Sequence, residues 1–142
     1  MRLDLCGLWR MNSSKFTDVP AQVPGSVLSN LLAQGLIPDP FYRDNEAAVR
    51  AVLYDDYTFS RTFSLTDSQL LKSNFLCLDG IDTVANVRIN GQCVADLHDM
   101  HTPKKILLDP DLLKNENTIC VSFTSPYHYI EEYDDKGLFE TY

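Results

Sequence analysis

The sequence of 142 residues lacks the features that mark several large classes of protein. No apolar run approaches the roughly 18 residues that a membrane-spanning helix needs. Its first residues show no apolar stretch followed by a small-residue cleavage site, so we expect no export signal and predict a cytoplasmic location. Positive charge is also scarce, since 12 Lys and Arg stand against 20 Asp and Glu. The resulting net charge of -8 argues against nucleic acid and anionic membranes as partners.

Cysteine is sparse, and its spacing is not that of a metal site. The four cysteines are Cys6, Cys77, Cys93 and Cys120, and no two of them form a Cys-x-x-Cys pair. Two thiolates therefore have no short segment from which to reach one zinc ion, and we predict no metal here. Cys77 and Cys120 lie among apolar residues, so we expect reduced thiols buried in the core.

Common catalytic motifs are missing as well. The sequence contains no Gly-rich phosphate loop, no Gly-x-Ser-x-Gly elbow and no His-Glu-x-x-His pair. His98 and His101 are three residues apart without a third ligand in metal spacing, which favours a loop over a metal site. Carboxylates are numerous at Asp55, Asp56 and residues 131–135, but no acid and base pair is identifiable, and residues 131–135 are predicted to be a solvated tail. We predict no catalytic residue, no metal and no cofactor.

What is present is a regular alternation of apolar and polar residues. Ala85, Val87 and Ile89 alternate with polar residues and are followed by Asn90-Gly91, a pair that suits the positive φ angles of a two-residue hairpin turn. A hairpin is therefore predicted, with residues 92–97 returning antiparallel.

Further strands are predicted where the same period of two recurs. Residues 57–64 and 119–123 should be half-exposed strands, and residues 74–78, apolar on both faces, should be a central one. Residues 3–10 and 104–108 are weaker candidates. One helix is predicted over residues 26–34, with Ser26 as its N-cap and Gly35 ending it. Together these elements predict an all-β, antiparallel sandwich with a single core over residues 1–142.

Four segments, in order, carry a resemblance to a known family: Val23-Pro24-Gly25-Ser26-Val27, residues 37–46 (Ile-Pro-Asp-Pro-Phe-Tyr-Arg-Asp-Asn-Glu), residues 78–85 (Leu-Asp-Gly-Ile-Asp-Thr-Val-Ala) and Val87-Arg88-Ile89-Asn90-Gly91. They resemble the sugar-binding domain that opens family 2 glycoside hydrolases of the β-mannosidase type. The resemblance implies a galactose-binding-like jelly roll with one or two short helices. It also implies a truncated domain that lacks its last strand or strands.

The same resemblance sets expectations about chemistry. Family members hold both catalytic glutamates in a TIM barrel that this chain does not contain, so the chain alone is expected to be inactive and to act as a non-catalytic sugar-binding or scaffolding domain of a β-mannoside hydrolase. The family's Gly-Trp-Asp-Trp-Gly segment lies beyond Tyr142. Asp44, Asn45 and Glu46, a polar cluster expected on a loop, are the predicted substrate-binding residues. Trp9 and Phe41 are expected to serve core or interdomain packing.

Two other functions remain open at this stage. The chain could be a free-standing carbohydrate-binding module that uses Tyr127, Tyr129 and Tyr133, or a structural sandwich that recognises a protein surface. The expected partners are the parent enzyme's other domains, including the barrel, and a carbohydrate substrate. An incomplete sheet edge predicts self-association, edge to edge or by exchange of residues 127–142.

Overall fold

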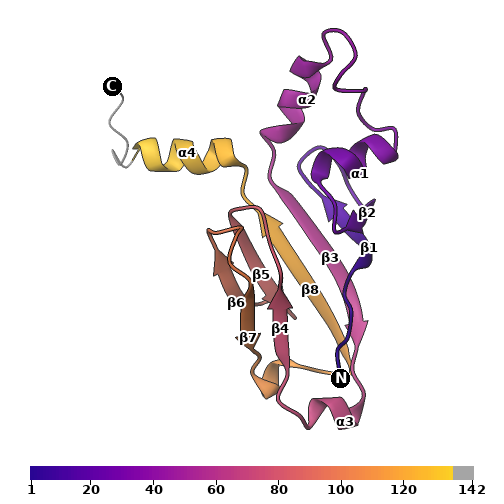
Figure 1. Ribbon diagram of the computed structural model, residues 1–142, viewed down its shortest axis with the longest axis vertical. Coiled ribbons are helices and arrows are strands. Elements are labelled where there is room, and N and C mark those ends of the chain that lie inside the picture. Colours follow the sequence, from indigo (N-terminus) through magenta and orange to yellow (C-terminus); the bar gives the residue numbers. More distant parts are fainter. Residues whose placement is uncertain (136–142) are drawn as a thin grey trace.

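The computed structural model describes residues 1–135, with side chains as far as residue 132. Strands form two antiparallel sheets, and short helices gather at the ends (Figure 1). In chain order the elements are β1 (Gly7–Asn12), β2 (Val19–Val23), α1 (Val27–Ala33), α2 (Glu46–Leu53), β3 (Tyr57–Ser64), α3 (Asp67–Leu70), β4 (Phe75–Leu78), β5 (Ala85–Ile89), β6 (Gln92–Leu97), β7 (Lys104–Leu107), the 3-10 helix η1 (Pro110–Leu112), β8 (Glu116–Phe123) and α4 (Pro126–Asp135). No helix within residues 1–135 has the length and apolar character to cross a membrane.

The larger sheet has six strands in the order β2-β1-β3-β8-β5-β6. Its register places Met11 opposite Phe59, Phe59 opposite Val121, and Val121 opposite Val87. Residues directly opposite each other in a sheet point to the same side, so these four side chains form one row across four strands. All four are buried, which accounts for the alternation in the sequence and confirms the expected antiparallel sandwich.

The second sheet contains only β4 and β7 among the described residues. Leu76 of β4 joins the same core cluster as Val87, so the small sheet packs on the apolar face of the large one. Phe75 is 48% exposed and Cys77 is also exposed. The prediction of a central strand over residues 74–78 is therefore wrong, because one face of β4 looks outward. The apolar run carried no information about which face a second layer covers.

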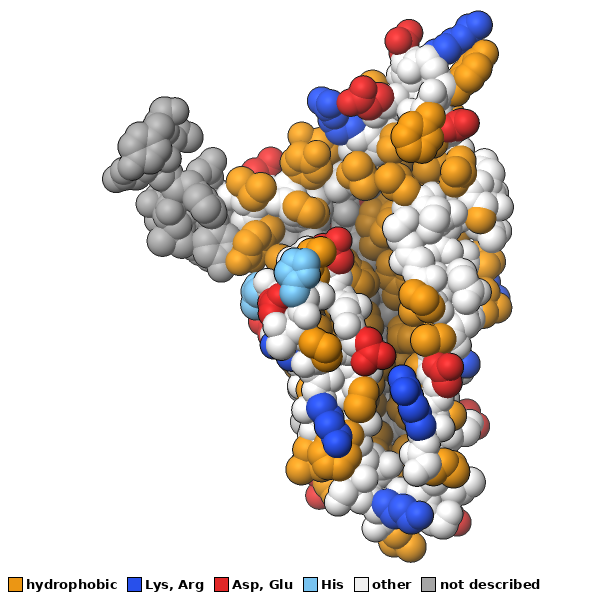
Figure 2. Space-filling model, viewed as in Figure 1, with side chains coloured by type: hydrophobic (Ala, Val, Ile, Leu, Met, Phe, Trp, Pro, Cys, Tyr) orange, Lys and Arg blue, Asp and Glu red, His pale blue; other side chains and the backbone are white. Residues whose placement is uncertain are grey.

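The small sheet leaves part of the large sheet uncovered. Figure 2 shows hydrophobic side chains along a hollow that runs down the molecule beside the β4–β7 side. Within residues 1–135, β4 pairs with β7 alone, so its other edge has no strand partner. Within the described residues the sandwich is therefore unequal, with six strands in one sheet and two in the other.

The predicted hairpin is confirmed as β5 and β6. Asn90 and Gly91 have φ angles of 50° and 84°, as a turn with two left-handed residues requires. The Asn90 side chain does more than tolerate the turn: its Nδ2 donates to the carbonyl of Leu112 (2.8 Å) and to Oδ1 of Asn117 (2.9 Å). Its Oδ1 accepts from the backbone N–H of Thr118 (3.0 Å). The turn is thereby fastened to β8.

The segment before β1 is held by two side chains of the large sheet. Trp9 is 6% exposed and packs in the core, and its Nε1 donates to the carbonyl of Leu5 (2.7 Å). Nη1 of Arg61 donates to the same carbonyl (2.8 Å) and to that of Cys6 (2.6 Å). The expectation that Trp9 serves packing is confirmed.

The predicted helix is α1, and its ends follow the expected chemistry. Ser26 caps it reciprocally with Ser29, and Gly35 follows with a φ of +66°. Asn30 is buried and bridges to β2, because its Oδ1 accepts from Gln22 N (2.7 Å) while its Nδ2 donates to Gln22 O (3.2 Å). The helix is thus fixed to the sheet by a polar contact as well as by Leu31, which is fully buried.

One sequence expectation about the helices is wrong, because Glu46 is the first residue of α2 and not part of a loop. The predicted solvated segment at residues 131–135 is helical, as part of α4, and its Glu131 and Glu132 are exposed as expected. In α2 the buried residues Val49 and Val52 lie three apart, a helical spacing that the dense run of alanine and valine concealed.

The cysteines also differ from expectation. Cys6, Cys77 and Cys93 are exposed and Cys120 is half-buried, and all four are free thiols. The prediction of buried core thiols is wrong for Cys77, whose side chain lies on the outward face of β4 opposite Lys105.

Candidate functional site

The loop that leads into α2 is closed by its own polar residues. Oδ1 of Asp39 accepts from the N–H of Phe41 (2.9 Å), and its carbonyl accepts from Nδ2 of Asn45 (2.9 Å). Arg43 sits at a φ of 52°, the left-handed region that a tight reversal needs. These bonds hold the loop at the end of the molecule opposite α3 (Figure 1).

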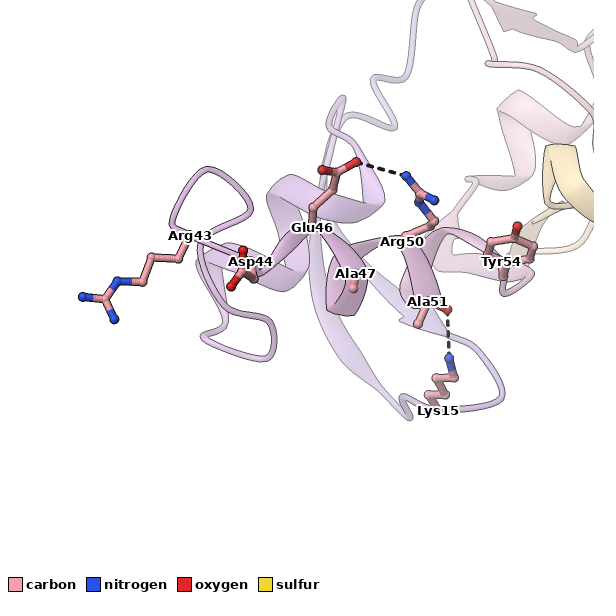
Figure 3. A pocket seen from close by; sticks show the side chains of 8 residues that line it. All are labelled: Lys15, Arg43, Asp44, Glu46, Ala47, Arg50, Ala51 and Tyr54. Atoms are coloured by element: carbon pink, nitrogen blue, oxygen red, sulfur yellow. Dashed lines mark hydrogen bonds and ion pairs between the residues drawn. The ribbon is translucent and has the colours of Figure 1, made fainter.

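A surface concavity of about 720 Å³ lies along α2. Figure 3 shows its lining side chains, which come from the loop, from α2 and from the β1–β2 turn: Lys15, Arg43, Asp44, Glu46, Ala47, Arg50, Ala51 and Tyr54. Nη2 of Arg50 lies 3.1 Å from Oε1 of Glu46. Nζ of Lys15 donates to the carbonyl of Ala51 (2.9 Å). The concavity is therefore open, polar and mixed in charge.

The structure brings two of the three predicted site residues to this concavity. Asp44 and Glu46 line it, whereas the side chain of Asn45 is turned to the carbonyl of Asp39. Glu46 is already paired with Arg50, an i,i+4 ion pair with both partners largely exposed. That pair contributes little to stability, so Glu46 can exchange Arg50 for a ligand at small cost.

Sequence reasoning missed Lys15, Arg50 and Tyr54 at this site. Lys15 comes from the turn between β1 and β2, 36 residues before the Ala51 that it contacts, and only tertiary structure places it there. Arg50 follows Glu46 by four residues, the spacing of an ion pair on a helix, and this signal was available once α2 was assigned.

The two carboxylates that precede β3, Asp55 and Asp56, accept hydrogen bonds from neighbouring segments. Burial raises the pKa of Asp55, but hydrogen bonds from Ser14, Ser13 and nearby backbone N–H groups outweigh it and hold that pKa below its ordinary value. Oγ of Ser14 donates to Oδ2 of Asp55 at 2.7 Å. Oδ1 of Asp56 accepts from the N–H of Ser125 at 2.6 Å. Both acids therefore anchor neighbouring segments.

Tyr57, the first residue of β3, is a core residue. It is 4% exposed, and its hydroxyl donates to the carbonyl of Val52 (3.1 Å). Burial, with the charge of Asp55 as a smaller cause, raises the pKa of Tyr57 to about 12. The hydroxyl thus stays protonated and ties β3 to the end of α2.

His98 and His101 lie in the loop after β6, as predicted. Nε2 of His98 lies 3.7 Å from Oδ2 of Asp96, and both side chains are mostly exposed. Within residues 1–135 no three His, Cys, Asp or Glu side chains come together in a way that could hold a metal ion.

The aromatic residues of this end are unusually open to solvent. Phe41 is 96% exposed, and Arg43 lies over the ring of Tyr42 at 5.2 Å from its centroid. Tyr54 stacks on Tyr127 of α4 with ring centroids 3.9 Å apart. Phe41 is therefore not a core residue. Of the two roles predicted for it, core packing is wrong and interdomain packing stays a prediction.

Two antiparallel sheets with short helices at both ends form a β-sandwich (Figure 1). Residues 9–141 match the family model described as glycosyl hydrolase 2 galactose-binding domain-like. The chain therefore belongs to the galactose-binding-like domains of family 2 glycoside hydrolases.

Relatives and solved structures agree with this assignment. The chain is 32% identical to a probable β-mannosidase of Caenorhabditis elegans over 94% of its own length and 34% identical to mouse β-mannosidase over 89%. It covers 15% of each of those proteins. The crystal structure of β-D-mannosidase from Dictyoglomus thermophilum matches 94% of the chain with a TM-score of 0.87 and 32% identity, over 17% of that chain. The chain thus corresponds to a small part of its relatives.

Proposed function

We propose that the chain is the non-catalytic N-terminal domain of a β-mannosidase-type hydrolase that removes terminal β-linked mannose. The observation that carries this proposal is the similarity to β-mannosidases over about nine-tenths of the chain and only 15% of theirs. The two carboxyl groups of a glycosidase must flank one sugar at a set separation. In this proposal a barrel outside the chain supplies them, and the sandwich braces that barrel.

Asp44, Asn45 and Glu46 are proposed to shape the mouth of the sugar pocket. Their support is the open concavity beside α2, which has carboxylates, guanidinium groups and an aromatic ring, the side-chain types that bind sugar hydroxyls and stack on sugar faces. Asn45 would contribute through the loop that it closes. We further propose that the strands follow the jelly-roll winding of the family, supported by the crossover that sets β8 between β3 and β5.

The decisive experiment compares two proteins on nitrophenyl β-mannoside. The chain of residues 1–142 should not exceed the uncatalysed rate, and the longer reading frame that contains it should turn the substrate over. Turnover by the chain that vanishes in Glu46→Gln would show that the domain itself is catalytic. A longer protein with no β-mannoside turnover would refute the assignment of the activity.

The alternative is a free-standing carbohydrate-binding module. The observation in its favour is the exposed aromatic surface at Tyr127, although one face of that ring is occupied by Tyr54. The side chain of Tyr133 lies outside the described residues. Calorimetric titration with manno-oligosaccharides separates the two functions, because saturation at micromolar sugar favours the module and no heat at millimolar sugar favours the scaffold. If the sandwich is purely structural, neither the chain of residues 1–142 nor the longer protein that contains it should bind sugar.

A cytoplasmic location is proposed as well. It is supported by the cysteines, since free thiols are typical of proteins in reducing compartments. All four are free, and three of them are exposed. Fractionation of cells that express the longer protein, followed by immunoblotting, tests it.

A further inference from the structure

The first turn of α4 is fixed to the sandwich by several contacts. Oδ1 of Asp56 accepts from the N–H of Ser125 (2.6 Å) and lies 3.0 Å from Nδ1 of His128. Ser125 is 4% exposed, and its Oγ donates to the carbonyl of Leu53 (3.0 Å). The start of the helix is thereby tied both to the beginning of β3 and to the end of α2.

Ring contacts hold the same turn on two further sides. Tyr127 stacks on Tyr54 with an interplanar angle of 14°. The ring of Tyr129 lies 6.0 Å from that of His98, which follows β6. The direction of α4 is therefore set by contacts with three different elements of the sandwich.

The helix so oriented covers little of the protein. Figure 1 shows α4 leading away from both sheets. Among residues 126–132 only Tyr129 is half-buried, and the others are exposed. Ile130 is 51% exposed. None of these residues belongs to the hydrophobic core. Figure 2 shows apolar side chains gathered at the base of this helix.

The charge of α4 points to what covers it. Its sequence, PYHYIEEYDD, has four acidic residues and no Lys or Arg, and its last turn contains no basic residue. Carboxylates near a helix C-terminus face the negative end of the helix dipole, which is unfavourable in an isolated helix. A neighbouring surface with Lys or Arg removes that repulsion and favours association.

We propose that α4 and the adjoining end of α2 form a docking surface for another domain of the longer enzyme. This α4 docking surface consists of Leu53, Tyr54, Tyr127, Ile130 and Glu131. Its partner face has an apolar centre that receives Ile130 and Tyr127, framed by Lys and Arg side chains that meet the acidic helix. The proposal rests on the proposed function, since it requires the remaining 85% or so of length that the relatives possess beyond the matched part.

Hydrogen exchange of residues 126–135 tests the proposal in the longer enzyme. The amides of α4 should exchange at least about tenfold more slowly there than in the chain of residues 1–142, because docking suppresses local opening. Ile130→Asp should return the exchange to the rate of the shorter chain. The matched control is Leu71→Asp, since Leu71 is 90% exposed beside α3 at the opposite end and should change nothing. Exchange in the β5–β6 hairpin reports that each variant is folded.

A second variant tests the charge of the partner. Glu131→Lys combined with Glu132→Lys should also accelerate exchange of α4 in the longer enzyme, because it removes the charges that the partner face meets. In the shorter chain the same change should slow exchange slightly or leave it unaltered, since Lys near a helix C-terminus is favourable. Equal exchange in both proteins, or full protection in Ile130→Asp, would overturn the proposal. So would protection of the shorter chain that grows with concentration, which would identify a second copy as the occupant. Turnover of β-mannoside, measured on the same samples, distinguishes failure of docking from failure of the proposed function.

Discussion

The contact between Asn90 and Asn117 allows a quantitative prediction about the stability of the sandwich. Asn117 is 2% exposed. Its Oδ1 accepts from Lys114 N (2.8 Å) and from Asn90 Nδ2 (2.9 Å), and its Nδ2 donates to Lys114 O (2.6 Å). Asn117→Ala removes all three bonds and leaves an amide of Asn90 without one of its acceptors.

The expected loss follows from the number of bonds. Each hydrogen bond contributes about 1 kcal/mol net, and a buried partner left unsatisfied adds to the loss, so the variant should lose about 3 kcal/mol of unfolding free energy. For a chain of 142 residues, an entropy of unfolding of about 2.1 cal/mol/K per residue converts this loss to a fall in Tm of about 10 °C. Differential scanning calorimetry and urea titration followed by circular dichroism measure the two quantities.

Two further variants make the prediction sharp. Asn90→Gly keeps a residue that accepts a φ of 50° but removes the side chain, so it should also destabilise although the turn is undisturbed. Because both side chains share one hydrogen bond, the double variant should lose less than the sum of the single variants. Asn86→Ala, on the outer face of β5, is the control. Its side chain also makes two hydrogen bonds, to Sγ of Cys93 and from Nε of Arg88, but both are exposed and can be replaced by water, so the variant should shift Tm by no more than about 2 °C. A comparably small shift in Asn117→Ala would refute the reasoning.

Three other predictions concern the core, the pH dependence and the assembly of the chain. Met11 is fully buried, so Met11→Ala should lower the free energy of unfolding by about 2–5 kcal/mol in urea titration. The control Met100→Ala, at a residue that is 40% exposed, should be nearly neutral. Equal effects of the two variants would show that Met11 is not part of the core. The pKa of Asp55 is lowered in the folded protein, so its contribution to stability is present above about pH 4 and is lost as the pH falls further. In Asp55→Asn the free energy of unfolding should therefore fall less steeply below about pH 4 than in the unchanged protein. Equal pH dependence of the two proteins would contradict this. Sedimentation across a concentration series should show self-association of the whole chain, and monomers with and without residues 127–142 would show that the free edge of β4 does not recruit a second copy.

Local sequence chemistry was enough to predict some elements of the fold. The β5–β6 hairpin follows from alternation and from an Asn-Gly pair that accepts positive φ, and α1 follows from a serine cap and a terminal glycine. Each of these signals acts between residues that are near in the chain, so no tertiary contact was needed to interpret them.

Elements whose meaning depends on a second layer were predicted less well. Residues 74–78 are apolar on both faces in the sequence, yet only the packing of the small sheet decides that Leu76 is buried and Phe75 open. Likewise the residues 126–135 have no strong helical stripe, and α4 is fixed by Asp56, Tyr54 and His98 from distant parts of the chain.

The candidate site divides in the same way. Asp44, Asn45 and Glu46 could be chosen from the sequence because a polar cluster on a loop can face a ligand. The concavity beside α2 includes Asp44 and Glu46, although Glu46 lies in the helix and not on the loop. The sequence by itself determined the alternation of β3, β5 and β8, the tight turn at Asn90-Gly91 and the family, since these depend on the local order of residues. Only the tertiary structure decided that Lys15 lies beside α2, that Asn45 closes its own loop and that Asn90 is bonded to Asn117, because such contacts require segments far apart in the chain to meet.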